Sequence, residues 1–393
     1  MGRARGHYVT KQYAGIPTGQ SAVERRGGRY RAFVPDPIGS LHVSLPASLA
    51  EELAHASEAV RALNDAPPKL ASLEAVARHL LRQESTASSR IEGLALGHRR
   101  IALADFDLEH SHDRKAADIV GNIHAMTEAL ALAQTPESIT PQHLKDIHRA
   151  LLHFGQDEPI AGVLRAEPGW IGGSTPIGAT YVPPPYEEVP RLLKDICRFM
   201  NRTDMPALMQ AAVTHAQFEN VHPFVDGNGR VGRCLIHTVL RRRGLAPGIV
   251  PPISVVLAAR RDPYFAGLTE FRDGKLNRWL SYFADATLVA AMRAEQLTAR
   301  IEQTEEDWLA NFKRRPRSDS AVYRVLRMLP AYPVLNVASV QEHLSISDVA
   351  AGNALNELTG AGVIRTVDDR VRGRVWECPS MYALMTEFEQ KLS

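Results

Sequence analysis

Twelve consecutive residues, HPFVDGNGRVGR, hold most of the side chains in this sequence that could do chemistry. His222 can accept a proton near neutral pH, because an imidazole with an ordinary pKa of about 6.5 titrates there. Asp226 suits Mg²⁺, which keeps water and takes carboxylate together with phosphate oxygens. A Gly-Asn-Gly turn follows at 227–229, and the guanidinium groups of Arg230 and Arg233 can fork onto phosphate oxygens. The stretch therefore predicts a reaction at a phosphate.

A helix is expected to position these groups. The helical pattern begins after the turn and ends at Gly244, a residue typical of helix stops. Gly227 and Gly229 let the backbone approach an anion closely, and N–H groups at a helix start attract negative charge. Arg230 and Arg233 are three residues apart, so both face one side of the helix. The chain lacks GxxxxGK[ST], which excludes an ordinary P-loop.

Each residue of the stretch also has a structural interpretation when it is taken alone. A single histidine is more often part of a core or a surface than a catalytic base. An isolated Asp-Gly-Asn-Gly string is more often a turn. Phe224 is expected to be a hydrophobic anchor for the loop. The combination of these residues, in this order and directly before a helix, favours chemistry over packing.

The stretch resembles the signature of the Fic family, HxFx[DE]GNGRxxR, and matches every fixed position. The similarity extends over about residues 35–310. Most Fic proteins transfer AMP from ATP to a Ser, Thr or Tyr hydroxyl of a protein and release pyrophosphate. The resemblance implies that His222 is the base, that Asp226 binds Mg²⁺, and that ATP is the substrate. It implies that the nucleotide is bound by Asp226, Gly227, Asn228, Gly229, Arg230, Gly232 and Arg233.

Two other reactions of the same core remain open. The kinase-like branch of the superfamily carries a lysine where Gly229 stands, which disfavours phosphate transfer here. Removal of AMP from a modified protein, or transfer of another nucleotide, is the alternative enzymatic function.

A second segment, SSRIEGL, resembles the inhibitory motif [ST]xxxE[GN] of Fic proteins. Ser88, Glu92 and Gly93 match its fixed positions, and Gly93 is also a typical helix stop. The resemblance implies that the Glu92 carboxylate pairs with Arg233, the arginine expected to hold the γ-phosphate, and repels that phosphate. Without this context Glu92 would be interpreted as a solvated surface residue. Glu92 could also orient a water that removes AMP.

Residues 162–185 are dense in Gly, Pro and β-forming residues, which predicts a hairpin followed by an extended proline segment. The segment resembles the flap of Fic proteins, which would hold a target by strand addition through Ile171, Gly172 and Gly173. An ordinary surface hairpin is the alternative, and Arg165 before it is expected to be structural. Tyr264 and Phe265 fall where relatives place aromatic residues near the nucleoside, with core packing as the alternative for both rings. Arg272 falls where relatives place a polar contact, often Asn, so this chain departs from the family pattern there.

The sequence predicts a mainly α fold with a β-hairpin flap and a small C-terminal α+β domain. Four parts are expected: a flexible basic arm over 1–30, an N-terminal helical region over 31–110 with the inhibitory helix at about 85–94, a catalytic core over 111–312, and a winged-helix-like domain over 313–393. Helical spacing of apolar residues predicts helices at 49–63, 71–81, 85–94, 115–134, 140–154, 186–201, 206–220, 263–272, 276–308, 321–329, 337–344 and 348–360.

The C-terminal part has three short helical patterns followed by two β-runs, the outline of a winged helix. Its candidate recognition helix, 347–361, contains Asp348 and Glu357 and no lysine or arginine. The basic residues nearby are Arg370, Arg372 and Arg374 on the expected wing. DNA binding by a regulator is therefore one interpretation, and protein contacts or a homodimer are the other.

Composition excludes several other classes of protein. The 393 residues carry a formal net charge of +2, which does not argue for a polyanion as partner. The three cysteines are widely spaced, and they are expected to be buried thiols in a reducing cytoplasm. Since no long apolar run is present, no membrane association is expected. The expected partners are ATP, an unidentified target protein and the chain itself.

Overall fold

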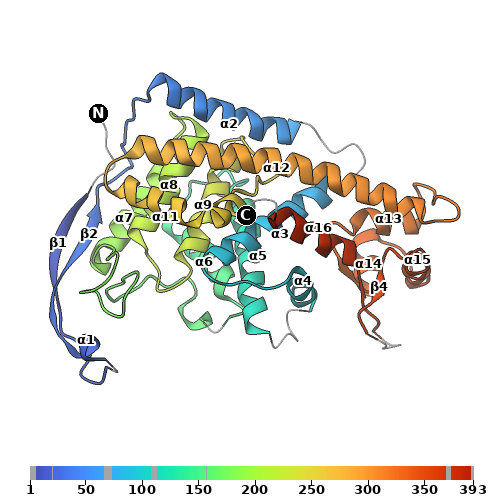
Figure 1. The fold of residues 1–393 in the computed structure, drawn as a ribbon, viewed down its shortest axis with the longest axis horizontal. Helices are drawn as coiled ribbons and strands as arrows, with labels where there is room; N and C mark the ends of the chain where they lie inside the picture. Colours follow the sequence, from blue (N-terminus) through green and yellow to red (C-terminus); the bar gives the residue numbers. More distant parts are fainter. Residues whose placement is uncertain are drawn as a thin grey trace. The chain divides into compact units, whose positions relative to one another are not determined.

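The computed structural model describes residues 6–19, 21–65, 73–107, 113–155, 157–368 and 373–390. Most of these residues are helical, which confirms the mainly α fold predicted from the sequence (Figure 1). The chain divides into two compact units. The first unit contains Met1–Ser57, His124–Leu245 and Arg260–Ala286. The second contains Glu58–Ile123, Ala246–Ala259 and Thr287–Ser393.

The N-terminal residues form a β-hairpin where the sequence predicted a flexible arm. Strand β1 (Gly6–Tyr13) pairs antiparallel with β2 (Gly28–Pro35) along its whole length, and α1 (Ala22–Arg25) lies in the connection. The Phe33 N–H also donates to the Val182 carbonyl at 2.9 Å. The prediction of an arm over 1–30 is wrong for β1, because its Tyr and Val residues favour a strand and pack against β2.

Two helices form the centre of the first unit. Helix α8 (Ala207–Val221) is buried around almost its whole circumference, as expected of a helix surrounded by other elements. Helix α9 (Asn228–Arg242) packs against it (Figure 1). The loop between them carries His222 to Gly227, so the predicted chemical residues lie at the core of this unit.

The other elements of the first unit surround this pair. Several helices belong to it entirely: α6 (Pro141–Leu152), α7 (Val189–Met200), α11 (Arg261–Arg272) and the 3₁₀ turns Glu158–Ile160 and Tyr186–Glu188. Three helices contribute residues to both units: α2 (Ala47–Asp65), α5 (Arg114–Leu132) and α12 (Leu276–Ala310). The indole N–H of Trp279 on α12 donates to the Ala212 carbonyl of α8 at 2.9 Å.

The predicted flap hairpin is reduced to one bridge between residues 171 and 181. Ile171 and Tyr181 exchange both backbone hydrogen bonds, at 2.8 and 3.1 Å. Proline ends the pairing, because the chain continues as Pro183-Pro-Pro185 and proline cannot donate to a ladder.

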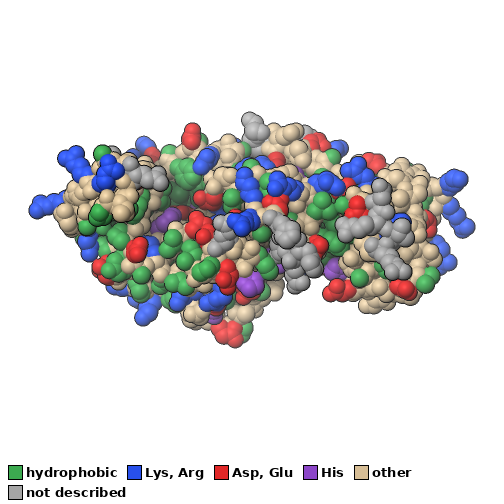
Figure 2. Space-filling view, turned by 90° about the horizontal axis from the view of Figure 1, so that it is seen from below, with side chains coloured by type: hydrophobic (Ala, Val, Ile, Leu, Met, Phe, Trp, Pro, Cys, Tyr) green, Lys and Arg blue, Asp and Glu red, His purple; other side chains and the backbone are tan. Residues whose placement is uncertain are grey.

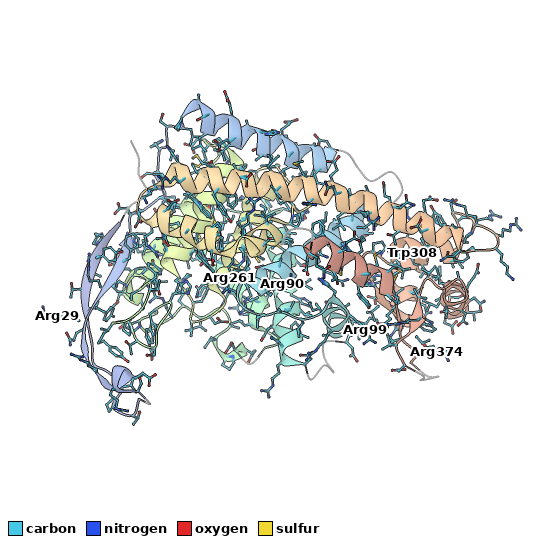
Figure 3. All side chains as sticks on the ribbon, viewed as in Figure 1. Arg29, Arg90, Arg99, Arg261, Trp308 and Arg374 are labelled. Atoms are coloured by element: carbon cyan, nitrogen blue, oxygen red, sulfur yellow. The ribbon has the colours of Figure 1, made fainter. Side chains whose placement is uncertain are left out.

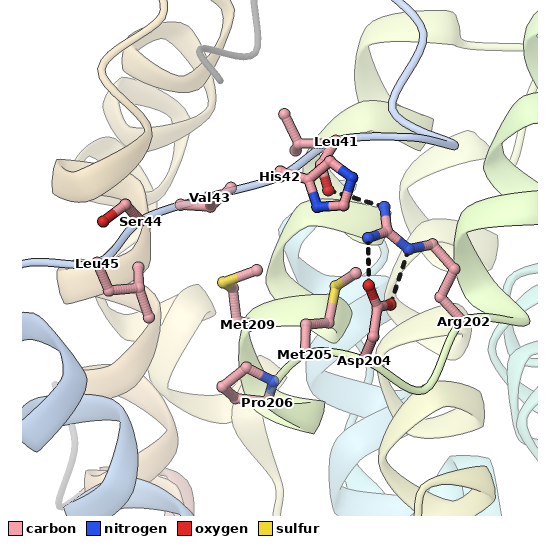
Figure 4. Close-up of a pocket in the computed structure, with 10 residues that line it drawn as sticks. All are labelled: Leu41, His42, Val43, Ser44, Leu45, Arg202, Asp204, Met205, Pro206 and Met209. Atoms are coloured by element: carbon pink, nitrogen blue, oxygen red, sulfur yellow. Dashed lines mark hydrogen bonds and ion pairs between the residues drawn. The ribbon is translucent and has the colours of Figure 1, made fainter. Parts of the chain in front are cut away.

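A cavity of about 430 Å³ lies elsewhere in the first unit, at the extended segment 41–45 (Figure 4). The Arg202 guanidinium donates to the Leu41 carbonyl at 2.7 Å and grips both carboxylate oxygens of Asp204 at 2.7 and 2.9 Å. None of the predicted site residues lines this cavity, so we assign the arginine an anchoring role for the segment.

The second unit contains the segment that resembles an inhibitory motif. Helix α3 (Leu73–Ile91) packs against α10 (Ile253–Ala259), where the buried Glu84 carboxylate accepts hydrogen bonds from the N–H and hydroxyl of Ser254. Helix α4 (His98–Phe106) follows α3.

The C-terminal part of the second unit forms a common core with α3 and α12. Three helices match the predicted boundaries to within one residue: α13 (Ala321–Met328), α14 (Val337–Leu344) and α15 (Asp348–Gly360). Strands β3 (Val334–Leu335), β5 (Trp376–Glu377) and β4 (Arg365–Thr366) form an antiparallel sheet in that order. Helix α16 (Pro379–Gln390), which the sequence did not predict, follows this sheet. No helix in the described part of the chain is both long and apolar enough to span a membrane.

Candidate active site

His222 adopts a backbone conformation that is rare for its residue type. It follows α8 as the C-cap with φ 47° and ψ 62°, in the left-handed region. Among the described non-glycine residues, Ser345 is the other with positive φ. Such a conformation costs on the order of 1 kcal/mol and persists where surrounding contacts enforce it. Its Nδ1 atom lies 4.0 Å from Glu219 Oε2, and the side chain is 21% exposed.

Arg165 supplies the contacts that hold this backbone. Its own N–H donates to the Pro223 carbonyl at 3.0 Å. Its guanidinium donates to the carbonyl oxygens of His222 at 2.8 Å, Pro184 at 2.5 Å, Glu167 at 3.2 Å and Val221 at 3.4 Å. Burial lowers the pKa of Arg165 to about 10, which leaves it charged at neutral pH. The structural role predicted for Arg165 is thus a clamp on the His222 loop.

Asn228 closes the loop from the other end. Its side-chain oxygen accepts from the Phe224 N–H and its amide donates to the Phe224 carbonyl, each at 2.9 Å. Both polar groups of the amide are thus used within the loop, and the residue is 2% exposed. The Asn228 side chain therefore shapes the loop, and its predicted contact with the nucleotide stays a prediction. Phe224 is buried as predicted.

Gly227 is required by both its backbone and its surroundings. Its φ is +75°, and a Cβ atom there would lie 2.7 Å from Leu151 Cδ2 and 3.4 Å from the His148 ring. The His148 ring stacks on Phe224 with centroids 3.7 Å apart. Glycine therefore lets the loop pass directly beside α6.

His148 is a site residue that the sequence did not reveal. Its Nδ1 accepts the Gly162 N–H at 2.9 Å, so Nε2 carries the proton and donates to the Asp226 carbonyl at 3.0 Å. Burial, with help from the nearby Arg230 charge, lowers its pKa to about 4. These partners lie 14 and 78 residues away in sequence, so no local pattern could have indicated them.

Asp226 and Arg230 form an ion pair at the start of α9. Arg230 NH2 donates to Asp226 Oδ2 at 2.7 Å. The Arg230 side chain is 5% exposed, whereas Asp226 is 55% exposed. The other two guanidinium nitrogens of Arg230, Nε and NH1, are buried and have no hydrogen-bond partner among the described residues. A buried cation with unused donors is a site for an anion.

Arg233 lies deeper, one turn further along α9, and is 1% exposed. Its NH1 atom is 3.4 Å from the Tyr264 hydroxyl, which lies 2.8 Å from His215 Nε2. Burial lowers the pKa of His215 to about 3, and the Arg233 charge adds to this effect, so the ring is neutral. Tyr264 is fully buried, so its ring packs in the core and its hydroxyl orients Arg233, while the predicted nucleoside contact stays a prediction.

Gly232 lies where α9 passes closest to α8. A Cβ atom there would be 2.8 Å from Glu219 Oε1 and 3.1 Å from His215 Nδ1. The sequence placed Gly232 among the nucleotide-binding residues, whereas the structure places it against α8. Because residue 232 has no side chain, the Glu219 carboxylate fits beside His222. Gly229 is in the first turn of α9, as predicted.

The remaining residues predicted near the nucleoside and the target are more exposed. Phe265 is 41% exposed, and the Arg261 guanidinium lies 5.5 Å from its ring centroid. Arg272 lies over the Tyr181 ring at 4.1 Å. Ile171, which begins the bridge and precedes Gly172 and Gly173, is 41% exposed. These side chains are accessible to a binding partner.

The segment with Glu92 follows the end of α3 in the second unit. Helix α3 stops at Ile91, and Gly93 has φ +83°, which confirms the predicted helix stop. Glu92 is exposed, in the turn. Ser88, one turn before Glu92, is fully buried.

The C-terminal wing is described only in part. Arg374 lies 5.8 Å from the Trp376 ring centroid, and the predicted Arg370 and Arg372 fall outside the described residues.

Comparison with known proteins matches two segments to family models. Residues 138–240 match the Fic/DOC family, and residues 50–131 match the Fic/DOC family N-terminal model. Curated relatives include the protein adenylyltransferase Fic of Drosophila ananassae and of Drosophila melanogaster. Each is 29% identical over 174 residues, which are 43% of this chain and 32% of the relative. The chain thus matches about a third of the length of these relatives.

Solved structures show the same fold. A Fic family protein from Desulfovibrio desulfuricans G20 has a TM-score of 0.52 at 20% identity and covers 86% of this chain and 97% of its own. Fic-1 from C. elegans has a TM-score of 0.51 at 22% identity, covering 65% of this chain and 74% of that protein. The family models agree with the signature at residues 222–233, and the chain therefore contains the two regions of the Fic/DOC family, at residues 50–131 and 138–240.

Proposed function

We propose that this protein transfers AMP from ATP to a Ser, Thr or Tyr hydroxyl of a protein, including its own chain. The observation that carries the proposal is the buried Arg230 guanidinium, whose Nε and NH1 have no partner among the described residues. It lies in the first turn of α9 beside the Asp226 carboxylate. A helix start with a buried cation suits a polyphosphate. The names of the curated Fic relatives support the same reaction.

His222 is the proposed base. Since its Nδ1 faces Glu219, we assign Nε2 to the proton of the attacking hydroxyl. The hydroxyl oxygen then bonds to the α-phosphorus, and the bond from that phosphorus to the bridging oxygen breaks. The electron pair of that bond leaves with pyrophosphate. The Glu219 carboxylate stabilises the positive charge that the ring acquires, and Arg165 holds the ring in place through the His222 carbonyl.

Asp226 is the proposed ligand for Mg²⁺. Its carboxylate is half exposed and gives one oxygen, Oδ2, to Arg230. Among the described residues no group of three or more His, Cys, Asp or Glu side chains could hold a metal. The donor set therefore fits an ion that takes one carboxylate and completes its shell with phosphate oxygens and water. When bound, Mg²⁺ would neutralise phosphate charge.

Glu92 is the proposed inhibitor of the reaction. Its carboxylate is exposed at the end of α3, and by the family resemblance it competes with the γ-phosphate for Arg233. Loss of this carboxylate should therefore raise modification, including self-modification. If Glu92 instead orients a water, its loss should slow AMP removal.

The test is incubation with ATP labelled either at the α- or at the γ-phosphorus, followed by mass spectrometry of the adduct. We expect label from the α-position only, more in Glu92→Gly than in wild type, and none in Glu92→Gly combined with His222→Ala. Glu137→Gly is a matched control, because it removes another exposed glutamate outside a helix. Transfer of γ-label would replace AMP transfer by phosphate transfer, and equal labelling of all variants would exclude His222 as the base. Incubation of the labelled product with wild type and Glu92→Gly measures AMP removal.

A further inference from the structure

A groove of about 550 Å³ lies between the β1–β2 hairpin and the flap segment of the first unit. Residues 176–182 form one wall and the end of α11 closes it. The hairpin face that lines it carries Tyr8, Arg29 and Arg31, the last two exposed at alternating strand positions. Arg29 is labelled on the hairpin in Figure 3, and Figure 2 shows several Lys and Arg side chains around that hairpin.

Two of the three arginines of this groove stack on aromatic rings. The Arg31 guanidinium lies 4.2 Å from the Tyr8 ring centroid, and Arg272 lies 4.1 Å from that of Tyr181. Neither these two nor Arg29 forms an ion pair with any described carboxylate. Asp273 is the acidic residue among the lining side chains. Three cations against one anion leave the groove positively charged, and stacking keeps the guanidinium edges available to carboxylates.

Tyr181 connects the groove to the candidate active site. Its ring lines the groove, while its hydroxyl donates to the Asn220 carbonyl at 2.5 Å, two residues before His222. Burial raises the pKa of Tyr181, so the hydroxyl stays protonated and remains a donor. A segment bound in the groove would therefore lie beside the end of α8, where the proposed base is.

We propose that this groove binds an acidic segment of the protein that is modified. The exposed rings and aliphatic chains of Tyr8 and Ile177, which are 50% and 42% exposed, would pack on apolar residues between the acidic ones. A protein is favoured over a nucleic acid because the chain's net charge is only +2 and the proposed acceptor is a protein hydroxyl. The inference rests on the proposed function, because it names the class of substrate for that site.

The test measures binding without ATP, so that it does not depend on AMP transfer. Fluorescence anisotropy would compare a labelled Glu-Gly repeat peptide with Lys-Gly and Ser-Gly peptides, on the full chain. We expect the acidic peptide to bind best, and Arg29→Glu with Arg31→Glu to weaken it by about tenfold or more. Arg26→Glu is the matched control for Arg29→Glu alone, because both make the same single charge change at an exposed position of this hairpin region and Arg26 does not line the groove. Circular dichroism would confirm that the variants fold.

Equal affinity for the three peptides, or an equal loss in Arg26→Glu, would overturn the proposal. Binding of a labelled oligonucleotide in preference to the acidic peptide would also overturn it and assign the groove to nucleic acid. If Glu92→Gly transfers AMP but the three peptides bind equally well, the proposed acidic-segment groove is wrong and the proposed AMP transfer is retained. If the acidic peptide binds in the groove and no variant transfers AMP, the proposed groove is retained and the proposed AMP transfer is wrong.

Discussion

Arg90 on α3 and Glu389 on α16 form an ion pair, with 2.5 Å between Arg90 NH2 and Glu389 Oε2. The same oxygen lies 3.0 Å from His98 Nε2, at the start of α4. Glu389 thus holds both ends of the connection that carries Glu92 (Figure 3 labels Arg90). Burial alone would raise the pKa of this carboxyl, but the hydrogen bonds from His98 and Arg90 outweigh it and lower the pKa. The C-terminal helix therefore fixes the turn with the proposed inhibitory glutamate.

Glu389→Gln is expected to loosen this turn and to raise self-modification above wild type, though less than Glu92→Gly does. The physical reason is that an amide offers Arg90 and the His98 ring a neutral acceptor in place of a charged one. Labelling with α-labelled ATP measures the effect, and hydrogen exchange of residues 92–97 reports the loosening. Glu387→Gln is the control, because it makes the same change on α16 at a carboxylate that pairs with Arg300 on α12 at 3.2 Å. Unchanged labelling together with faster hydrogen exchange would show that the order of this turn does not control inhibition.

Arg165→Lys, made in the Glu92→Gly background, is expected to lower the rate of AMP transfer by at least about tenfold. A lysine ammonium has one nitrogen and cannot reach the several carbonyl oxygens that the guanidinium fork serves. The left-handed backbone of His222 should then relax away from the reactive pose. Single-turnover labelling measures the rate, and thermal unfolding shows how much stability is lost with it. A rate equal to that of the background variant would refute the positioning role.

Gly227→Ala should destabilise the protein more than Gly244→Ala. Both glycines have positive φ, +75° and +68°, so alanine is strained at each by about 1 kcal/mol. A Cβ atom at Gly227 would also collide with Leu151, whereas nothing lies within 4 Å of one at Gly244. Urea unfolding of the two variants isolates the collision, because the strain is common to both. Equal losses of stability would mean that the loop can move away from α6.

Acid should destabilise the first unit between about pH 6.5 and pH 4. His148 and His215 stay neutral in the fold because burial lowers their pKa values to about 4 and about 3. In the unfolded chain both histidines take up protons below the ordinary histidine pKa of about 6.5, whereas in the folded chain they do not. The free energy of unfolding therefore decreases as the pH is lowered through this window. Each histidine contributes at most about 1.4 kcal/mol per pH unit. His148→Gln should reduce the slope in urea unfolding across this range, whereas His153→Gln, at an exposed position, is the control.

The motif could be predicted from the sequence because its parts are local. The glycine turn and the helix that follows it depend on residues within one short stretch. Gly93 likewise ends its helix through its own backbone. Such features follow from spacing and residue type alone.

The supporting residues could not be predicted because their partners are distant in sequence. His148 meets Asp226 through tertiary packing, and Tyr264 is placed under Arg233 by the core around Trp279. The β1–β2 hairpin was missed because residues 1–30 are rich in Gly and Arg. Such a segment resembles a polar tail until the strand that pairs with it is known. The fold class can be predicted from the periodicity of apolar residues, whereas these contacts can be found only once the fold is known.

Arg165 contacts main-chain oxygens alone, which has a consequence for how the loop can change in evolution. Side chains at Glu167 and Val221 could be exchanged without loss of the clamp, since each offers the same carbonyl. The arginine has no such freedom, because no other side chain has its fork. The clamp should therefore tolerate changes in the side chains of its carbonyl partners but no change of the arginine, whereas a charge-pair network would constrain both partners.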